Sequence, residues 1–313
     1  MNKLPLHITN GDSLTTFLNQ LGVQGEKLTW QEMLCEGPTT VSVYSEEFLK
    51  LRKSFFNEIY NIELDTEIIN VELDKLNHPE KYSEIILWFE YDLFCHINMV
   101  AIISLIQQKK IQLPIYLVCS GRVESSKNLK GLAELSDEEL QKHFKNKILL
   151  NSQDLDIAST IWGIYCGIDH NLLKPYIVKS SSFKYLSNCL KAHLERFPDS
   201  VSGLNILESN ILEIISNQHI TSKHHLLGYA LNYQGYYGFG DIQLSRIIDE
   251  LSIFYTVEEN SIILNRKGHE ALLGQYNFAS ELSNKMIYGG VEKFNFQFSK
   301  SKNQLINSLL NAH

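Results

Sequence analysis

A buried strand that runs directly into an apolar helix and then into a second strand is the pattern that most constrains this fold. Residues 84–89 (EIILWF) are predicted as a buried strand, residues 93 to about 108 as a strongly apolar helix, and residues 114–119 as the next strand. Strands that alternate with helices imply a mainly parallel sheet covered by helices on both faces. The chain is therefore predicted to have an α/β fold.

The same alternation begins at the start of the chain. Residues 4–10 are predicted as a strand, and Asp12 or Ser13 is positioned to cap the helix that follows, before a second strand at residues 26–30. We predict a Rossmann-like, mainly parallel, three-layer sheet domain over residues 1–125. This prediction requires residues 4–9 and 85–89 to lie in the same sheet.

After the predicted sheet domain, the sequence pattern changes from alternating strands and helices to mainly helices. From residue 136 to about 196 the pattern is helical throughout, which predicts a helical extension over residues 126–200. Three short helices at residues 207–215, 222–231 and 241–251 are then followed by a hairpin signal at residues 254–264. This order is the winged-helix pattern, so residues 201–313 are predicted as a winged-helix-like domain with a C-terminal tail.

Charge separates the classes of partner that a winged helix can have. The chain carries 28 basic and 36 acidic residues, a net charge of -8. Between residues 201 and 276 only Lys223, Arg246, Arg266 and Lys267 are basic. Because a duplex binder presents a basic face to phosphates, nucleic acid is an unfavoured partner and protein contact is favoured.

Cysteine usage and hydropathy indicate the cellular compartment in which the chain is expected. The five cysteines (Cys35, Cys95, Cys119, Cys166 and Cys189) are odd in number and widely spaced, which is typical of reduced thiols. The apolar runs stop short of the roughly 18–20 residues that a membrane span needs, and the first residues lack a signal-peptide pattern. We expect a cytoplasmic protein without a membrane anchor.

The carboxyl ends of parallel strands are where such sheets bind ligands, and polar residues follow each predicted strand. Because parallel strands bring these ends to one edge, we predict a ligand-binding site there. The predicted catalytic residues are Asp12, Glu90, Asp92 and His96. The predicted substrate-binding residues are Asn10, Gly11, Ser13, Trp30, Glu36, Arg52 and Arg122.

Each candidate has a structural alternative. Asp12 and Asp92 are each as consistent with a helix cap as with catalysis. Asp92 and His96 stand four residues apart, which suits an oriented general base but more often gives a surface pair. Cys95 is favoured as a buried structural thiol. Arg122 is equally consistent with an anion clamp and with a solvated surface arginine.

Known catalytic signatures exclude several classes. Residues 11–14 spell GDSL, the nucleophile block of a family of esterases, but the Asp-x-x-His pair of that family does not occur in the chain. Neither a G-x-G-x-x-G nor a P-loop motif is present, and the C-x-x-C and H-E-x-x-H zinc motifs are missing as well.

Several blocks of the sequence resemble a known bacterial family, the domain of unknown function numbered 1835. The matching blocks are HITNGDS (7–13) with Leu18, Trp30, LCEGP (34–38), Phe48, Arg52, LWFEYDLFCHIN (87–98), GLAELS (131–136), ERFP (195–198), GL (203–204) and YGGV (288–291). The resemblance implies a bacterial cytoplasmic protein and transfers no reaction. It favours a functional role for Asp12, Glu36, Glu90 and Asp92, which fall inside these blocks.

Two hypotheses about function follow. The first is an enzyme acting on a small phosphorylated or nucleotide-like substrate, with Asp12, Glu90 and Asp92 holding a divalent cation such as Mg²⁺ or acting as bases, and Arg52 or Arg122 on the anion. The second is a non-catalytic regulatory or adaptor protein, whose α/β domain senses a small-molecule ligand while the winged helix contacts a protein partner. In either case, the ligand is expected within reach of both Asp12 and Asp92.

Overall fold

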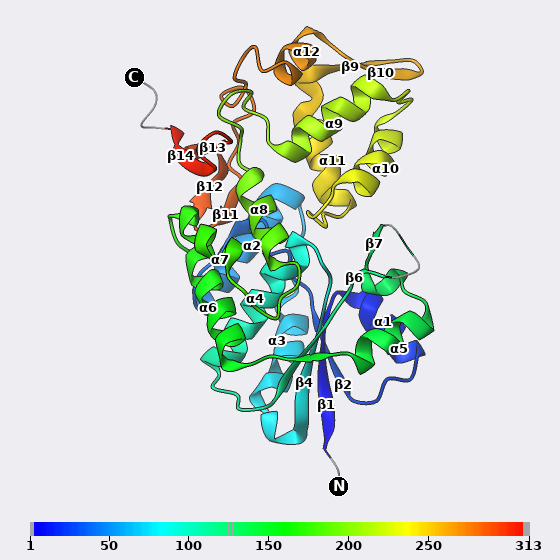
Figure 1. The fold of residues 1–313 in the computed structure, drawn as a ribbon, viewed down its shortest axis with the longest axis vertical. Helices are drawn as coiled ribbons and strands as arrows, with labels where there is room; N and C mark the ends of the chain where they lie inside the picture. Colours follow the sequence, from blue (N-terminus) through cyan, green and yellow to red (C-terminus); the bar gives the residue numbers. More distant parts are fainter. Residues whose placement is uncertain (1–2, 124–125, 127, 309–313) are drawn as a thin grey trace.

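The structure is a computed structural model and describes residues 3–123, 126 and 128–308. Its centre is a five-stranded sheet of order β2-β1-β4-β5-β8, shown from the side in Figure 1. The first four of these strands are parallel, and β8 is antiparallel to β5. The strands are β1 (Leu4–Asn10), β2 (Glu26–Trp30), β4 (Tyr82–Phe89), β5 (Ile115–Cys119) and β8 (Ile148–Leu149).

The register confirms that the first and third predicted strands share a sheet. Strand β1 pairs with β4, placing Ile8 opposite Leu87 and Thr9 opposite Trp88. The antiparallel edge strand was not predicted, because the sequence pattern indicated helix throughout residues 136–196. Strand β8 has only two residues, which is too few to show a period-2 alternation.

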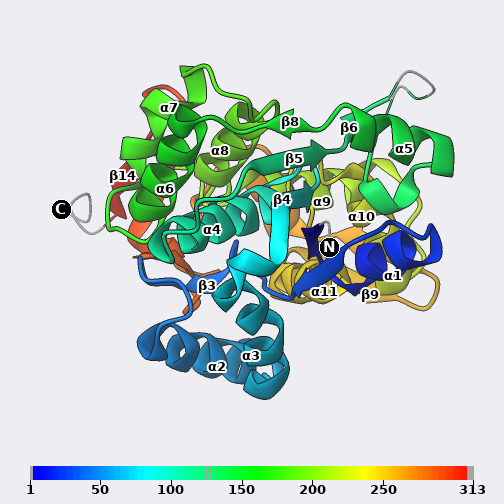
Figure 2. The same cartoon turned by 90° about the horizontal axis from the view of Figure 1, so that it is seen from below.

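Helices cover both faces of the sheet, because the side chains of β4 alternate between two apolar cores. Ile85, Leu87 and Phe89 pack into the larger core with α4. Ile86 and Trp88 pack into the smaller core with α1 and α5. Figure 2 shows these two sets of helices on opposite sides of the strands. The helices named here are α1 (Asp12–Gln20), α4 (Leu93–Gln108) and α5 (Asp137–Lys145).

Further helices flank this three-layer arrangement. Helices α2 and α3 follow β2 and β3 in the chain, and α6, α7 and α8 form the helical region after the sheet. Their bounds are α2 (Glu46–Tyr60), α3 (Thr66–Asp74), α6 (Ser152–Tyr165), α7 (Lys174–Val178) and α8 (Leu186–Glu195). A short hairpin, β6 (Gly121–Arg122) and β7 (Leu129–Lys130), follows β5. The predicted domain boundary at residue 125 lies outside the described residues.

The C-terminal module confirms the predicted order of three helices and a hairpin. It consists of α9 (Ile206–Asn217), α10 (Lys223–Tyr233), α11 (Asp241–Glu250), β9 (Tyr255–Glu258), β10 (Ser261–Leu264) and α12 (Arg266–Leu272). In Figure 1 this module lies above the sheet, on the side toward which β1 rises from the N-terminus. It therefore faces the carboxyl ends of the parallel strands.

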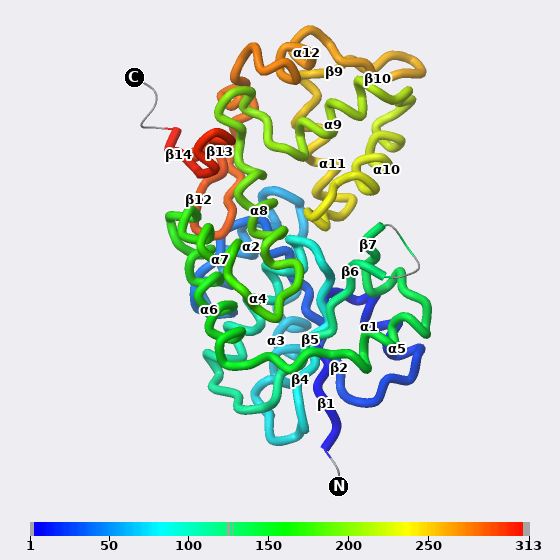
Figure 3. Tube along the Cα trace, in the orientation of Figure 1, coloured from blue at the N-terminus to red at the C-terminus, as the bar shows by residue number. Residues whose placement is uncertain are grey.

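The segment after α12 returns to the α/β part instead of extending as a tail, as the trace in Figure 3 shows. Strand β11 (Ile287–Gly289) pairs in parallel with β3 (Gly37–Pro38) and antiparallel with β12 (Val291–Glu292). A last hairpin joins β13 (Phe296–Ser299) to β14 (Gln304–Asn307). In the described part of the chain, each helix is too short or too polar to cross a bilayer.

Candidate functional site

A cavity of about 460 Å³ lies where the carboxyl ends of β1 and β2 meet the C-terminal module. Its walls come from Asn10 and Gly11, from residues 30–33, from α2 and the connection that follows it, from the first turn of α4, and from residues 238–243. Ligand pockets in proteins have volumes of roughly 300–1,000 Å³. The sheet edge predicted from the topology therefore carries a cavity of suitable size.

The sequence predicted one wall of this cavity and missed the other. Asn10, Gly11 and Trp30 were predicted as binding residues, and all three line the cavity. The wall formed by Gly238, Gly240 and α11 was not predicted, because sequence pattern does not show how a second module docks on a sheet. Glu32 also lines the cavity; its position after the second strand was its only sequence signal.

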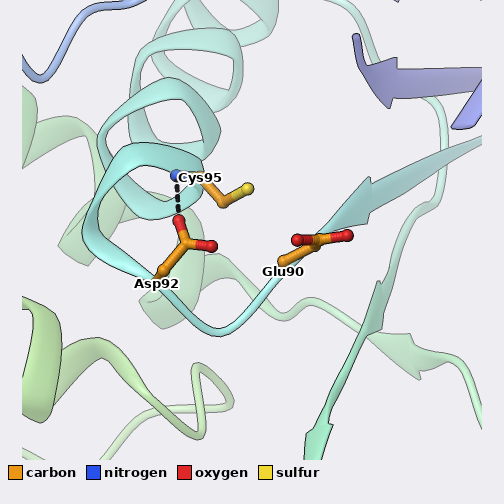
Figure 4. A group of neighbouring side chains, drawn as sticks. All are labelled: Glu90, Asp92 and Cys95. Atoms are coloured by element: carbon orange, nitrogen blue, oxygen red, sulfur yellow. Dashed lines mark hydrogen bonds between the residues drawn. The ribbon is translucent and has the colours of Figure 1, made fainter. Parts of the chain in front are cut away.

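Beside the cavity, the end of β4 brings together Glu90, Asp92 and Cys95, whose ligand atoms all lie within 4.8 Å of one another (Figure 4). Asp92 is the N-cap of α4, and its Oδ1 accepts the Cys95 N–H at 2.7 Å. Burial raises the pKa of Asp92 to about 7, and the charge of Glu90 adds to this shift. The predicted cap at Asp92 is confirmed, and its carboxyl is poised to change protonation near neutral pH.

A loop from the C-terminal module seals this end of β4. The Leu93 N–H donates to the Tyr236 carbonyl at 2.7 Å, and the Phe94 N–H donates to the Tyr237 carbonyl at 3.1 Å. At Gly238 an added Cβ would lie 2.1 Å from Asp92 Cγ, so the loop backbone touches the carboxyl. The N–H groups of a helix start are often free to bind an anion, but here the loop carbonyls accept them.

The donor set at this end fits some cations better than others. Two carboxylates and a thiol suit a borderline ion such as Zn²⁺, whereas Mg²⁺ and Mn²⁺ prefer oxygen ligands. Burial raises the pKa of the Cys95 thiol well above its usual value, and the Asp92 and Glu90 charges raise it further. Asp12 is not a member of this group, so the predicted set of three carboxylates does not assemble around one ion.

Asp12 lies at the start of α1, but it does not cap the helix. Gly11 is the N-cap, with a φ of 95°, and Asp12 is the first helical residue. Its carboxylate accepts a hydrogen bond from the Gln31 side chain, and Gln31 lines the cavity. Ser13 is exposed on α1. Asp12 thus reaches the cavity through Gln31 and is not itself among the lining residues.

His96 is buried and bonds to backbone, not to the Asp92 carboxylate. Its Nδ1 lies 2.9 Å from the Asp92 carbonyl oxygen. Burial lowers the pKa of His96 to about 4. Neither the predicted surface pair nor the Asp–His base pair forms, because the first turn of α4 directs the ring toward the main chain.

Arg52 and Glu36 hold the fold together beside the cavity. The Arg52 guanidinium is fully buried; it pairs with Glu32 at 3.0 Å and also donates to the Met33 and Glu36 carbonyls. All three of its nitrogen atoms are therefore engaged, and Arg52 is not available as the predicted anion clamp.

Glu36 joins the two parts of the molecule. Its carboxylate pairs with Arg246 of α11 at 2.8 Å and accepts a hydrogen bond from Tyr60. Burial alone would raise the pKa of Glu36, but Arg246 and the Tyr60 hydroxyl hold that pKa below its usual range. Because both of its carboxylate oxygens are bonded within the chain, Glu36 is not available as the predicted substrate-binding residue.

Arg122 is exposed on β6, and its backbone N–H donates to the Tyr185 hydroxyl at 2.8 Å. It is not among the residues that line the cavity. The solvated alternative for Arg122 agrees with this position.

Comparisons with known proteins assign this chain to no family. No protein-family model matches the chain, and no curated protein matches it. Among solved structures, it is similar to the DNA-binding, cleavage and re-ligation domain of topoisomerase II from Plasmodium falciparum, with 14% identity and a TM-score of 0.48. That match covers 80% of this chain and 42% of the other, and a likeness so distant transfers no function.

Proposed function

We propose that this chain is an enzyme that acts on a small, nucleotide-like substrate bound in the cavity at the carboxyl edge of the sheet. The cavity itself is the observation that carries this proposal. It has the volume of a ligand site, it is lined by two separate parts of the chain, and Trp30, Phe56 and Phe94 supply aromatic surface for a ring.

The base end of such a substrate has more support than the phosphate end. Among the described residues that line the cavity there is no lysine or arginine, and the nearby Arg52 is engaged with Glu32. A phosphorylated substrate would therefore need a metal ion to offset the charge of the carboxylates.

Asp92 is the proposed proton-transfer group, with Glu90 as the neighbour that adjusts it. A general acid or base works best when its pKa lies near the operating pH, and the pKa of Asp92 is raised to about 7. Gly238 touches this carboxyl and also lines the cavity, so it stands between Asp92 and a bound substrate, and proton transfer requires the Gly238 loop to move away from Asp92.

The binding part of the proposal is tested by thermal shift with adenosine, guanosine and their mono- and triphosphates, each with and without Mn²⁺ or Zn²⁺. A ligand at 100 times its Kd stabilises a protein by about 2.7 kcal/mol. Ile242→Trp should abolish the shift, since Ile242 lines the cavity and is 49% exposed. The matched control is Ile263→Trp, at a residue 45% exposed on the hairpin of the C-terminal module. The proposal fails when no compound shifts the transition, or when Ile242→Trp leaves the shift intact.

A second candidate is the non-catalytic adaptor, in which the winged-helix-like module reports ligand binding to a protein partner. The observation in its favour is that one segment, residues 236–243, has two contacts. Its second half lines the cavity, and its first half bonds to α4. The Asp92→Asn variant distinguishes the enzyme from the adaptor. An enzyme loses turnover on this substitution and keeps ligand binding, whereas an adaptor forms no product even in its wild-type form.

A further inference from the structure

Helix α10 and the loop after it lack charge, which is unusual for a segment that reaches the surface. Residues 224–240 contain no lysine, arginine, aspartate or glutamate, although 20% of the whole chain is charged. The same residues include four of the 15 tyrosines. Because binding surfaces are depleted in charged residues and enriched in tyrosine, this segment is a candidate for a second binding site.

Two tyrosines of α10 form a ridge between two hollows. Tyr229 and Tyr233 stand four residues apart on one face of the helix, and their rings are stacked with centroids 6.1 Å apart. Both line a first hollow of about 520 Å³, which α10 and Asn128 complete, and a second of about 470 Å³, which α9 completes. Each volume lies within the range of small-molecule sites. Tyr233 is 65% exposed, so a ligand can reach its ring.

The polar groups in these hollows both donate and accept hydrogen bonds. Side-chain amides predominate: Asn128 and Asn232 line the first hollow, and Asn210, Asn217 and Gln218 line the second. Within the described part of the chain, the three amides of the second hollow make no hydrogen bond, and those of Asn217 and Gln218 are exposed. An amide offers two donors and two acceptor lone pairs, so these groups are open to a ligand that does both.

The same lining disfavours a charged ligand. Among the described residues of the two hollows there is no lysine or arginine to receive a phosphate or carboxylate, and the single acidic residue is the exposed Glu213. A hydroxyl group donates and accepts as an amide does. A neutral ligand that combines many hydroxyl groups with apolar C–H faces for the tyrosine rings is a sugar.

We propose that the ridge of Tyr229 and Tyr233 binds a neutral oligosaccharide, with sugar rings on the tyrosine faces and hydroxyl groups bonded to the amides of the two hollows. Because the ridge separates two hollows, a chain of several sugar units fills more of this site than one unit does. The site shares no lining residue with the cavity at the sheet edge, so this inference does not depend on the proposed function.

Isothermal titration calorimetry on the full chain tests the ligand class. The neutral probes are maltotriose, cellotriose and triacetylchitotriose, each compared with its own monosaccharide, and trigalacturonate is the charged counterpart. At least one neutral trisaccharide should bind, roughly tenfold more tightly than its monosaccharide, which corresponds to about 1.4 kcal/mol from the second hollow. Trigalacturonate should not bind, because its carboxylates meet Glu213 and no cation.

A pair of exposed tyrosines tests the position of the site. Tyr233→Ala removes one ring of the ridge and should weaken trisaccharide binding roughly tenfold, whereas Tyr233→Phe keeps the ring and most of the affinity. The matched control is Tyr276→Ala, since Tyr276 is 54% exposed in the same module and lines neither hollow. Tyr276→Ala should leave the Kd unchanged, and thermal unfolding verifies that all three variants are folded.

Two results would overturn the proposal. If no neutral trisaccharide binds at about 10 mM, a concentration that detects affinities of only a few kcal/mol, the ridge is not a sugar site. If a trisaccharide binds equally to Tyr233→Ala and to the wild type, the sugar lies elsewhere on the protein. Binding of single-stranded DNA instead, lost in Tyr233→Ala, would assign the ridge to base stacking and would also refute the sugar.

Discussion

The ends of β2 and β4 lie at the same edge of one sheet, yet they are treated in opposite ways. After β2, Trp30 and Glu32 line a cavity that stays open to a ligand. After β4, the N–H groups of Leu93 and Phe94 are bonded to a loop, and the Asp92 carboxyl is covered by Gly238.

This difference teaches that a strand end is a site only when nothing else in the chain occupies it. The rule that ligands bind at the carboxyl edge of parallel strands predicts both positions equally. The C-terminal module distinguishes them: residues 236–238 fill one position, while Gly240 and α11 form only the rim of the other.

The largest loss of stability is expected from a substitution at Gly238, where the loop covers the Asp92 carboxyl. Gly238→Ala should destabilise the protein by roughly 2–5 kcal/mol, because an alanine at a φ of +68° is strained and its Cβ must displace Asp92. Gly235→Ala is the matched control, since Gly235 has a φ of +69° and open space around it. It should cost only the backbone strain, about 1–2 kcal/mol. Urea unfolding measures both.

Equal losses in Gly238→Ala and Gly235→Ala would mean that the loop does not press on Asp92. Gly228→Ala serves as a second control, because Gly228 is helical and open; it should be neutral or stabilise by up to about 1 kcal/mol.

A smaller effect concerns pH. Asp92 in the unfolded chain titrates near 3.8, whereas burial raises its pKa in the folded state to about 7. The folded state therefore binds the extra proton, so the stability that this proton contributes is present below about pH 4 and is lost as pH rises through 7. Asp92→Asn keeps a capping oxygen for the Cys95 N–H and removes the titration.

Wild type should accordingly lose about 1–3 kcal/mol relative to Asp92→Asn between pH 5 and pH 8, at about 1.4 kcal/mol per pKa unit. Urea unfolding of both proteins at the two pH values gives the comparison. Parallel pH dependences for the two proteins would show that the Asp92 carboxyl is not sealed from water.

The smallest effect sharpens the contrast at α1. Asp12→Ala should cost only a few tenths of a kcal/mol, because Asp12 is exposed and makes no capping bond. Asp65→Ala is the matched comparison: Asp65 caps α3 and accepts the Glu67 and Ile68 N–H groups, so its loss should cost about 1 kcal/mol. Thermal unfolding of the two variants decides, and a cost at Asp12 equal to that at Asp65 would restore the predicted cap.

The sequence alone determined the elements whose signal is local. The short apolar run of β4 and the long apolar run of α4 predicted a buried strand and a buried helix, because a run of each length suits only one of these elements. Three short helices before a hairpin predicted the order in the C-terminal module. Position after a strand was enough to select Asn10, Gly11 and Trp30 for the cavity wall. The same reasoning selected Glu90 and Asp92, which the fold does bring together.

Only the tertiary structure decided which of these groups stay free. Arg52 and Glu36 have the chemistry of ligand-binding residues, but each is paired within the chain. Glu32 pairs with Arg52, and Arg246 pairs with Glu36. The partners lie 20 and 210 residues away along the chain, and a charged group pairs with whatever the fold brings within about 3 Å. Residue type fixes what a side chain can do, whereas its neighbours in space decide whether it remains available for a ligand.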